Sequence, residues 1–167
     1  MSAPGTVHDM HASGKVRATT SLHSLVDISP EECLGLLSAH HVGRLCVIDD
    51  AYPIALPVNY RVAPDGSGGA AIVVRTRAGS LLDRDAVRVG FEIDGIDHLT
   101  ETGWSVLVRG LLHHAESAEA VPSMQNWDPR SWAGPLDTWL VLTPDSITGR
   151  RLESSVSEWA FAIEGYL

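Results

Sequence analysis

The sequence predicts a mainly β protein, a small antiparallel barrel of about six to seven strands with a few short flanking helices. Short apolar stretches recur along the chain, and turn-forming residues separate them. Long helices do not alternate with these stretches, as they would in a parallel sheet. The chain has 167 residues, 44% of them hydrophobic and 20% charged, which is enough for one domain with its own core.

The first expected element is a helix over residues 30–39. Ser29 is its expected N-cap, Pro30 suits the first helical position, and Glu32 completes a capping box. Residues 1–22 are small and polar without a period, so we expect a mobile leader before a single domain over residues 23–167. The apolar side chains expected to face the core are Cys33, Leu34, Leu36 and Leu37.

The first two expected strands form a hairpin. Residues 42–48 make one strand, Asp49 and Asp50 turn the chain, and residues 53–62 return as its partner. Residues 64–69 contain one proline and three glycines, so they predict a long turn.

Residues 70–77 predict a third strand, which ends in Arg75 and Arg77. A short helix is expected from Ser80 to about Asp85, since Ser80 and Asp83 fit the capping pattern and Gly79 breaks the strand. Unpaired N–H groups at a helix N-terminus suit a phosphate. On spacing alone, a plain strand-to-helix joint with solvated arginines is the more common interpretation.

Four more strands are expected in the second half, over residues 87–93, 104–114, 138–142 and 146–152. An acidic connection over 94–103 separates the first two, and a turn at Pro144 and Asp145 separates the last two. Residues 117–136 predict a short helix and an irregular segment with Trp127 and Trp132. The residues after 152 are apolar enough to pack on something, either their own barrel or a partner's cleft.

Composition excludes several classes of function. A net charge of -9 and a pI near 5.2 argue against a nucleic-acid partner or an anionic membrane surface. No apolar run reaches membrane-span length, and residues 1–15 lack the apolar region of a signal peptide. The two cysteines lie in apolar patterns and predict buried thiols rather than a disulfide framework. We therefore expect a cytoplasmic protein.

No metal site and no hydrolase site is expected. None of the eight histidines shows the helical spacing or the flanking cysteine pair that zinc sites use. No G-x-S-x-G motif is present for a nucleophilic serine, and residues 66–69 lack the spacing of a dinucleotide loop. We predict no catalytic side chain.

Six short motifs occur in an order that resembles the pyridoxamine 5'-phosphate oxidase-like family, the FMN-binding split β-barrels. No single motif is specific, but the ordered set is, and the resemblance spans about residues 27–152. The motifs are residues 43–45 (GRL), 56–60 (LPVNY), 74–80 (VRTRAGS), 90–94 (GFEID), 103–110 (GWSVLVRG) and 147–151 (ITGRR).

The resemblance implies a split-barrel homodimer with FMN in two clefts at the subunit interface. It implies a flavin-dependent oxidoreductase acting on a small molecule, because the isoalloxazine carries the redox chemistry. By the family pattern, Trp104 approaches the cofactor; the alternative is a tryptophan buried in the core. The strand along the isoalloxazine ring would be Pro57, Val58, Asn59 and Tyr60, and the phosphate would lie among Val74, Arg75, Thr76, Arg77, Gly79, Ser80 and Leu81.

Leu81 departs from the family pattern, in which most relatives have a lysine that reaches the phosphate. Loss of one charge-assisted contact costs ~1.5–3 kcal/mol of binding free energy, unless Arg77 or Arg84 compensates. Three alternatives to an FMN oxidoreductase therefore stay open. They are a reductase dependent on the deazaflavin F420, a non-catalytic dimer that binds or senses a flavin or another ligand, and a chain without a flavin.

Overall fold

Six antiparallel strands close into a ring in the computed structural model, which describes residues 23–115, 128–129 and 136–154. The strand order is β1-β7-β4-β3-β2-β5-β6, and β7 also pairs with β6, which closes the barrel. The predicted mainly β, antiparallel barrel is thereby confirmed. The elements are β1 (His23–Ile28), α1 (Pro30–Ala39), β2 (Val42–Asp49), β3 (Tyr52–Pro64), β4 (Ala70–Thr76), β5 (Val87–Asp97), β6 (Thr102–His114) and β7 (Thr138–Ser154).

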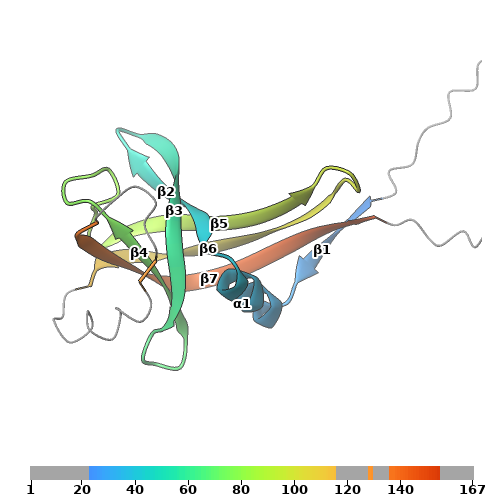
Figure 1. Cartoon of the computed structure of the whole chain (residues 1–167), viewed down its shortest axis with the longest axis horizontal. Coiled ribbons are helices and arrows are strands. Elements are labelled where there is room, and N and C mark those ends of the chain that lie inside the picture. Colours follow the sequence, from blue (N-terminus) through green and yellow to red (C-terminus); the bar gives the residue numbers. More distant parts are fainter. Residues whose placement is uncertain (1–22, 116–127, 130–135, 155–167) are drawn as a thin grey trace, which may run out of the picture.

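The long strand β7 serves both the barrel and an extension beyond it. Residues 138–142 of β7 pair with β4, and residues 149–154 pair with β1 on the same edge. The opposite edge pairs with β6 from Leu140 to Leu152. The sheet of β5, β6, β7 and β1 therefore continues past the barrel as a projecting arm (Figure 1). We call this extension, with β1 and the hairpin of β5 and β6 at its tip, the arm.

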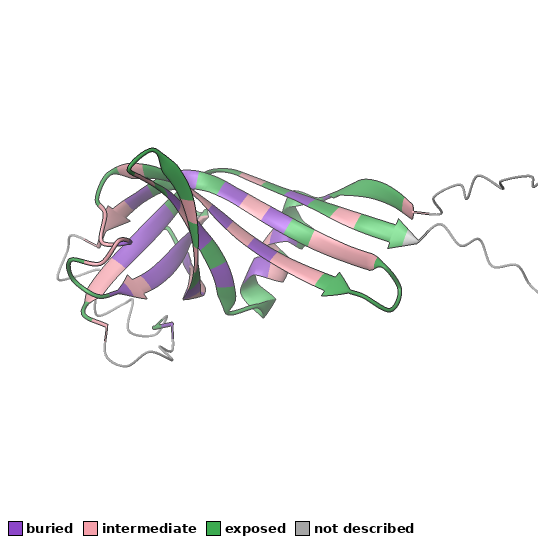
Figure 2. Ribbon diagram, turned by 90° about the horizontal axis from the view of Figure 1, so that it is seen from above, coloured by how far each residue is buried: buried purple, intermediate pink, exposed green. Residues whose placement is uncertain are grey.

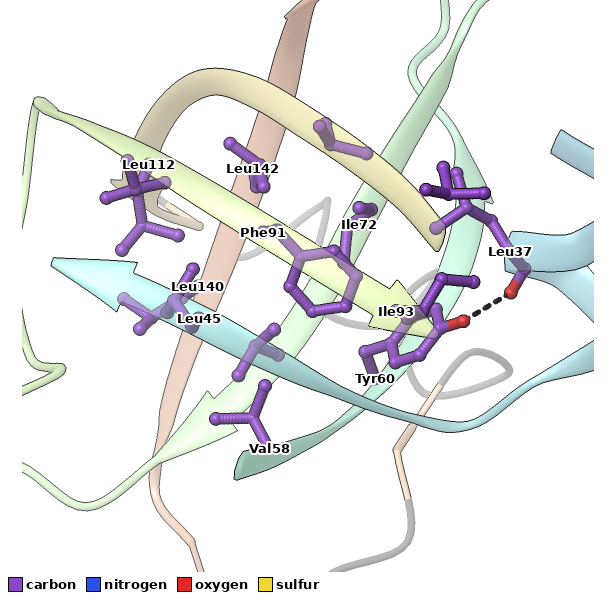
Figure 3. Packing of buried hydrophobic residues seen from close by; sticks show 14 of the residues in the cluster. Leu37, Leu45, Val58, Tyr60, Ile72, Phe91, Ile93, Leu112, Leu140 and Leu142 are labelled. Atoms are coloured by element: carbon purple, nitrogen blue, oxygen red, sulfur yellow. Dashed lines mark hydrogen bonds between the residues drawn. The ribbon is translucent and has the colours of Figure 1, made fainter. Parts of the chain in front are cut away.

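Alternation along the strands fills the barrel with apolar side chains. Figure 2 shows buried residues alternating with more exposed ones in the barrel, whereas the tip of the arm is mostly exposed. Tyr60 and Phe91 pack edge to face at the centre, with ring centroids 4.9 Å apart. The residues drawn around them in Figure 3 include Leu37, Leu45, Val58, Ile72, Ile93, Leu112, Leu140 and Leu142.

Helix α1 begins where the sequence predicts. The Ser29 hydroxyl accepts a hydrogen bond from the Glu32 N–H at 3.2 Å, and Pro30 takes the first turn. The Glu32 carboxylate pairs with Arg151 of β7, which ties the helix to the arm. Cys33 and Leu37 are buried. A Cβ on Gly149 would lie 2.6 Å from the Cys33 Sγ, so the glycine permits this close packing.

Two expectations about the strands are wrong, and one strand was missed. Pro144 and Asp145 do not turn the chain. They lie in a bulge of one continuous β7, where the register with β6 shifts next to Gly110. Residues 94–97 continue β5 rather than belonging to a connection. Strand β1 was not expected at all, because most of its side chains are exposed and carry little apolar pattern.

The leader over residues 1–22, Trp127, Trp132 and the tail after 154 lie outside the described residues. Most of the segment 117–136 lies outside them as well. No described helix has both the length and the apolar character needed to cross a bilayer.

Candidate functional site

Strands β3 and β4 bring the central residues of the expected site side by side, because Tyr60 is the cross-strand partner of Val74. Alternation then divides these residues between two faces of the sheet. Pro57, Asn59 and Arg75 are at least partly exposed and lie on the outer face. The residues that face the interior and are buried are Val58, Tyr60, Val74 and Thr76.

The Tyr60 side chain is committed to the core. Its hydroxyl donates a hydrogen bond to the Leu37 carbonyl at 2.7 Å (Figure 3). Burial raises the pKa of the Tyr60 phenol well above its usual value. A ligand on the outer face would therefore meet Tyr60 only through its backbone.

Arg75 lies on the outer face near the end of β4, with its side chain 22% exposed. Its Nη1 donates to both carboxylate oxygens of Asp128, at 3.2 and 3.1 Å, and its Nη2 donates to the Leu136 carbonyl. The guanidinium also lies over the Trp139 ring. Its Nε is buried and has no hydrogen-bond partner among the described residues. A buried donor without a partner is costly, so Arg75 retains an unsatisfied capacity to bind an acceptor.

The helix predicted after Gly79 is wrong, because residues 77–86 form successive turns. Gly79 takes a positive φ of 72°. The Ser80 N–H donates to the Arg77 carbonyl, and the Asp83 N–H donates to the Ser80 carbonyl, each at 3.0 Å. Only six residues separate Ser80 from the start of β5, and so short a helix is marginal. No helix dipole therefore acts at this site.

The N–H groups of this turn bind carboxylates instead. The Ala78 N–H donates to Asp137 at 2.9 Å, and the Gly79 N–H donates to Asp83 at 2.6 Å. The Gly79 N–H, and after it the His114 ring at 2.8 Å, lowers the pKa of Asp83. The turn is thus built to bind anions, and the chain supplies the anions itself.

The hydroxyls of Thr76 and Ser80 lie 2.7 Å apart and link the end of β4 to the turn. Leu81, at the position where relatives have a lysine, is partly buried and packs against the core. Arg84 pairs with Asp49 at 2.5 Å and so is engaged elsewhere. The Arg77 side chain is exposed and makes no hydrogen bond or ion pair with the described residues. Of the two arginines expected to compensate for Leu81, only Arg77 is available.

Trp104 lies in the arm, away from the other expected site residues. It pairs with Arg151 of β7, whereas Arg75 pairs with Trp139 of the same strand. At about 3.3 Å per residue, these two positions on β7 are on the order of 35 Å apart. Trp104 stacks near His40, with ring centroids 4.9 Å apart, and lines a cavity of about 520 Å³ in the arm. One chain does not bring Trp104 and Arg75 into one site.

Sequence reasoning missed Asp128 and Trp139 as neighbours of Arg75, and Asp137 as the partner of the Ala78 N–H. Trp139 follows from the pairing of β4 with β7, which the sequence pattern does not specify. Nothing in the pattern around Asp128 indicates its contact, since 53 residues separate it from Arg75. Over the residues that the structure describes, no three histidine, cysteine or acidic side chains are grouped to hold a metal ion.

One protein family matches most of this chain. The sequence profile of the family described as pyridoxamine 5'-phosphate oxidase matches residues 29–151. An uncharacterized protein of Mycobacterium tuberculosis, Rv0080, is 30% identical over 136 residues, which cover 79% of this chain and 88% of that protein.

Two solved structures share the fold of this chain. The FAD binding protein from Mycobacterium smegmatis is 28% identical, with a TM-score of 0.64, over 77% of this chain and 100% of that one. DIP1874 from Corynebacterium diphtheriae, a conserved protein of unknown function, is 22% identical with a TM-score of 0.66, over 77% and 98%. The second likeness shows the fold alone.

Proposed function

Because the chain belongs to the pyridoxamine 5'-phosphate oxidase family, we propose that it binds a flavin and acts as a flavin-dependent oxidoreductase on a small molecule. FMN is the proposed cofactor, held with its phosphate at Arg75 and the turn after β4. The fold and the recognition of the family are confirmed. The binding of FMN, the oxidoreductase reaction and the homodimer are what we propose.

The observation that carries the proposal is the state of Arg75. Its side chain is mostly buried, and within the part of the chain that the structure describes its Nε has no partner. Beside it, the N–H groups of Ala78 and Gly79 bind carboxylate oxygens. Backbone N–H groups and an arginine fork are the donors that suit a phosphate. The residues present therefore fit the phosphate of a flavin mononucleotide. The relative from Mycobacterium smegmatis, an FAD binding protein, supports a flavin as the ligand.

The isoalloxazine ring would supply the electron-transfer chemistry, and the chain would bind and orient it. The outer face of β3, with Pro57 and Asn59, is proposed to lie along the ring. Asn59 on this face lies next to Arg75, because Tyr60 and Val74 are paired. No side chain near Arg75 is needed as an acid or a base, so we assign no catalytic residue.

A homodimer is proposed because one chain leaves the site incomplete. Arg75 and Trp104 pair with opposite ends of β7, because Arg75 pairs with Trp139 and Trp104 pairs with Arg151. The family pattern places both near the cofactor, and a second copy is the simplest way to bring another Trp104 to Arg75. Sedimentation equilibrium tests this assembly, and a monomer at micromolar concentration contradicts it.

Titration of the purified protein with FMN, FAD and F420, followed by the absorbance and fluorescence of each ligand, tests the cofactor. We expect tightest binding of FMN. Arg75→Ala should weaken it by roughly tenfold to a hundredfold, as expected for loss of a charge-assisted contact. Arg88→Ala is the matched control, because Arg88 is an exposed arginine paired with Asp145. A protein that binds none of the three ligands contradicts the proposed function.

A non-catalytic flavin-binding or sensing dimer is the second candidate, and Leu81 favours it. Leu81 packs against the core, so the site lacks the cation that most relatives place there. An F420-dependent reductase is a further variant of the same site. Flavin-loaded protein that is not reduced by NADH, NADPH or reduced F420 in anaerobic assays favours the non-catalytic candidate. Reduction by one of these donors favours the oxidoreductase.

A further inference from the structure

The donors proposed for the flavin phosphate are already held by carboxylates of this chain. Asp128 binds the Arg75 guanidinium, Asp137 binds the Ala78 N–H, and Asp83 binds the Gly79 N–H. These three aspartates come from separate parts of the sequence, yet the fold gathers them around one turn. A phosphate and a carboxylate seek the same donors.

Asp128 is the one of the three that pairs with a charged donor, the Arg75 guanidinium. Its carboxylate contacts Arg75 and no other described side chain. The Asp83 carboxylate, in contrast, also binds the His114 ring. The Asp128 side chain is 44% exposed, so water can solvate its carboxylate once it leaves Arg75. Asp128 is therefore the carboxylate that an incoming anion has to displace in order to pair with Arg75.

Few cations lie near the turn, so competition for Arg75 affects how tightly a phosphate binds there. Leu81 supplies no cation, and Arg84 is paired with Asp49. Of the arginines in residues 75–84, Arg75 and the exposed Arg77 are then left to meet a phosphate. A phosphate that binds Arg75 while Asp128 stays in place would meet a carboxylate a few ångströms away, and like charges at that distance repel.

We infer that Asp128 is an internal competitor for the phosphate of the ligand, so that this chain binds phosphorylated flavins less tightly than its donor groups allow. The inference rests on the proposed function for the identity of the ligand, but not for the competition itself. Binding of a phosphate at Arg75 breaks the ion pair between Arg75 and Asp128 and forms a guanidinium–phosphate pair in its place. A flavin without a phosphate binds without breaking the ion pair between Arg75 and Asp128.

The variant Asp128→Asn tests the inference, with Asp145→Asn as the control. Asp145 also pairs with one arginine, at 2.5 Å, on an exposed part of the barrel, so both variants change the net charge equally. Each protein is titrated with FMN and with riboflavin, which lacks the phosphate. For Asp128→Asn we expect a dissociation constant for FMN about three- to tenfold lower and an unchanged one for riboflavin. Asp145→Asn should leave both unchanged.

Inorganic phosphate is the second probe, because its binding does not depend on any flavin. The rise in unfolding temperature with added phosphate should be larger for Asp128→Asn than for the unchanged protein. Asp128→Ser repeats both measurements if Asp128→Asn folds poorly. If no flavin binds but phosphate binds more tightly to the variant, the proposed function fails and the inference stands.

An opposite role for Asp128 gives an opposite result. If Asp128 held Arg75 in place for the phosphate, Asp128→Asn would weaken FMN and phosphate binding. Weaker or equal binding of both probes by the variant overturns the inference. Equal tightening of FMN and riboflavin overturns it as well, since it would not depend on the phosphate.

Discussion

The guanidinium of Arg75 lies 4.7 Å from the centroid of the Trp139 ring, across the pairing of β4 with β7. Arg75 faces outward on β4, and Trp139 is its cross-strand partner near the start of β7. The tryptophan face attracts the cation and limits the positions that the arginine can take. Trp139 thereby holds Arg75 against the barrel wall, on the face where we propose that the flavin binds.

This contact predicts an energetic coupling between Arg75 and Trp139. A double-mutant cycle of Arg75→Ala and Trp139→Leu in urea unfolding should give a coupling free energy of about 0.5–1 kcal/mol. Arg75→Ala and the double variant both lose the ion pair between Arg75 and Asp128. The free energy of that loss therefore cancels in the cycle. Additive effects on the free energy of unfolding would show that the stacked geometry contributes nothing to stability.

Tyr60→Phe should lower the free energy of unfolding by about 1–2 kcal/mol. The change leaves the Leu37 carbonyl without its buried donor. Tyr52→Phe is the control on the same strand, because Tyr52 is 70% exposed, and we expect a change within about 0.5 kcal/mol. Similar losses for both variants would contradict the prediction.

The raised pKa of Tyr60 also predicts a pH dependence. The unfolded chain ionises this phenol near its ordinary value of 10.0, whereas the folded chain keeps it protonated. Its contribution to stability is therefore complete below about pH 10 and is lost as the pH rises further. The stability difference between the unchanged protein and Tyr60→Phe should shrink above pH 10, measured by urea unfolding at a series of pH values.

Gly110→Ala should destabilise the barrel by about 2–4 kcal/mol. A Cβ there would lie 2.1 Å from the Thr143 carbonyl oxygen, beside the bulge of β7. Gly90→Ala is the matched control, because its Cβ would meet only the Cys46 Cβ at 3.5 Å. Thermal unfolding followed by circular dichroism measures both. A destabilised Gly90→Ala beside an unaffected Gly110→Ala would refute the steric account.

Asp83→Asn should loosen the turn after β4, since Asp83 joins the Gly79 N–H to the His114 ring. We expect the Gly79 amide to exchange with deuterium about tenfold faster. Asp97→Asn is the control, because the Asp97 pKa is likewise lowered, first by the Leu99 N–H, in the arm. That variant should leave exchange at Gly79 unchanged, and faster exchange there would contradict a local role for Asp83.

The lowered pKa of Asp83 gives the sign of its pH dependence. Its contribution to stability is complete above the ordinary aspartate value of 3.8 and is lost as the pH falls through the lower folded value. The difference in unfolding temperature between the unchanged protein and Asp83→Asn should therefore be full at about pH 6 and shrink below about pH 4. A difference that grows on acidification would contradict the assignment.

Local pattern was sufficient for much of the fold. Ser29 and Pro30 begin α1 because capping depends on neighbouring residues. The alternation of Val58 and Tyr60 with Asn59 correctly indicates a strand with one buried face. Pro144 and Asp145 were misread as a turn, because the same residues suit a bulge when a long partner strand such as β6 lies alongside.

The site was harder to predict for the same reason. Ser80 and Asp83 have the spacing of a helix cap, but the Asp83 carboxylate binds the Gly79 N–H and the His114 ring, and the segment forms turns. Sequence neighbours do not reveal that His114 lies within reach. The resemblance to the family singled out Arg75, which the structure places on the outer face of β4, but it did not reveal that Asp128 holds it.

By itself, the sequence determined the alternation that builds the barrel wall and the start of α1. Each of these depends on residues a few positions apart. Only the tertiary structure decided that β7 closes the ring, that Asp128 meets Arg75 and that Trp104 lies far from both. These relationships depend on strand register and on contacts across tens of residues. Their free energies come from packing the whole barrel, and no local stretch of the chain encodes them.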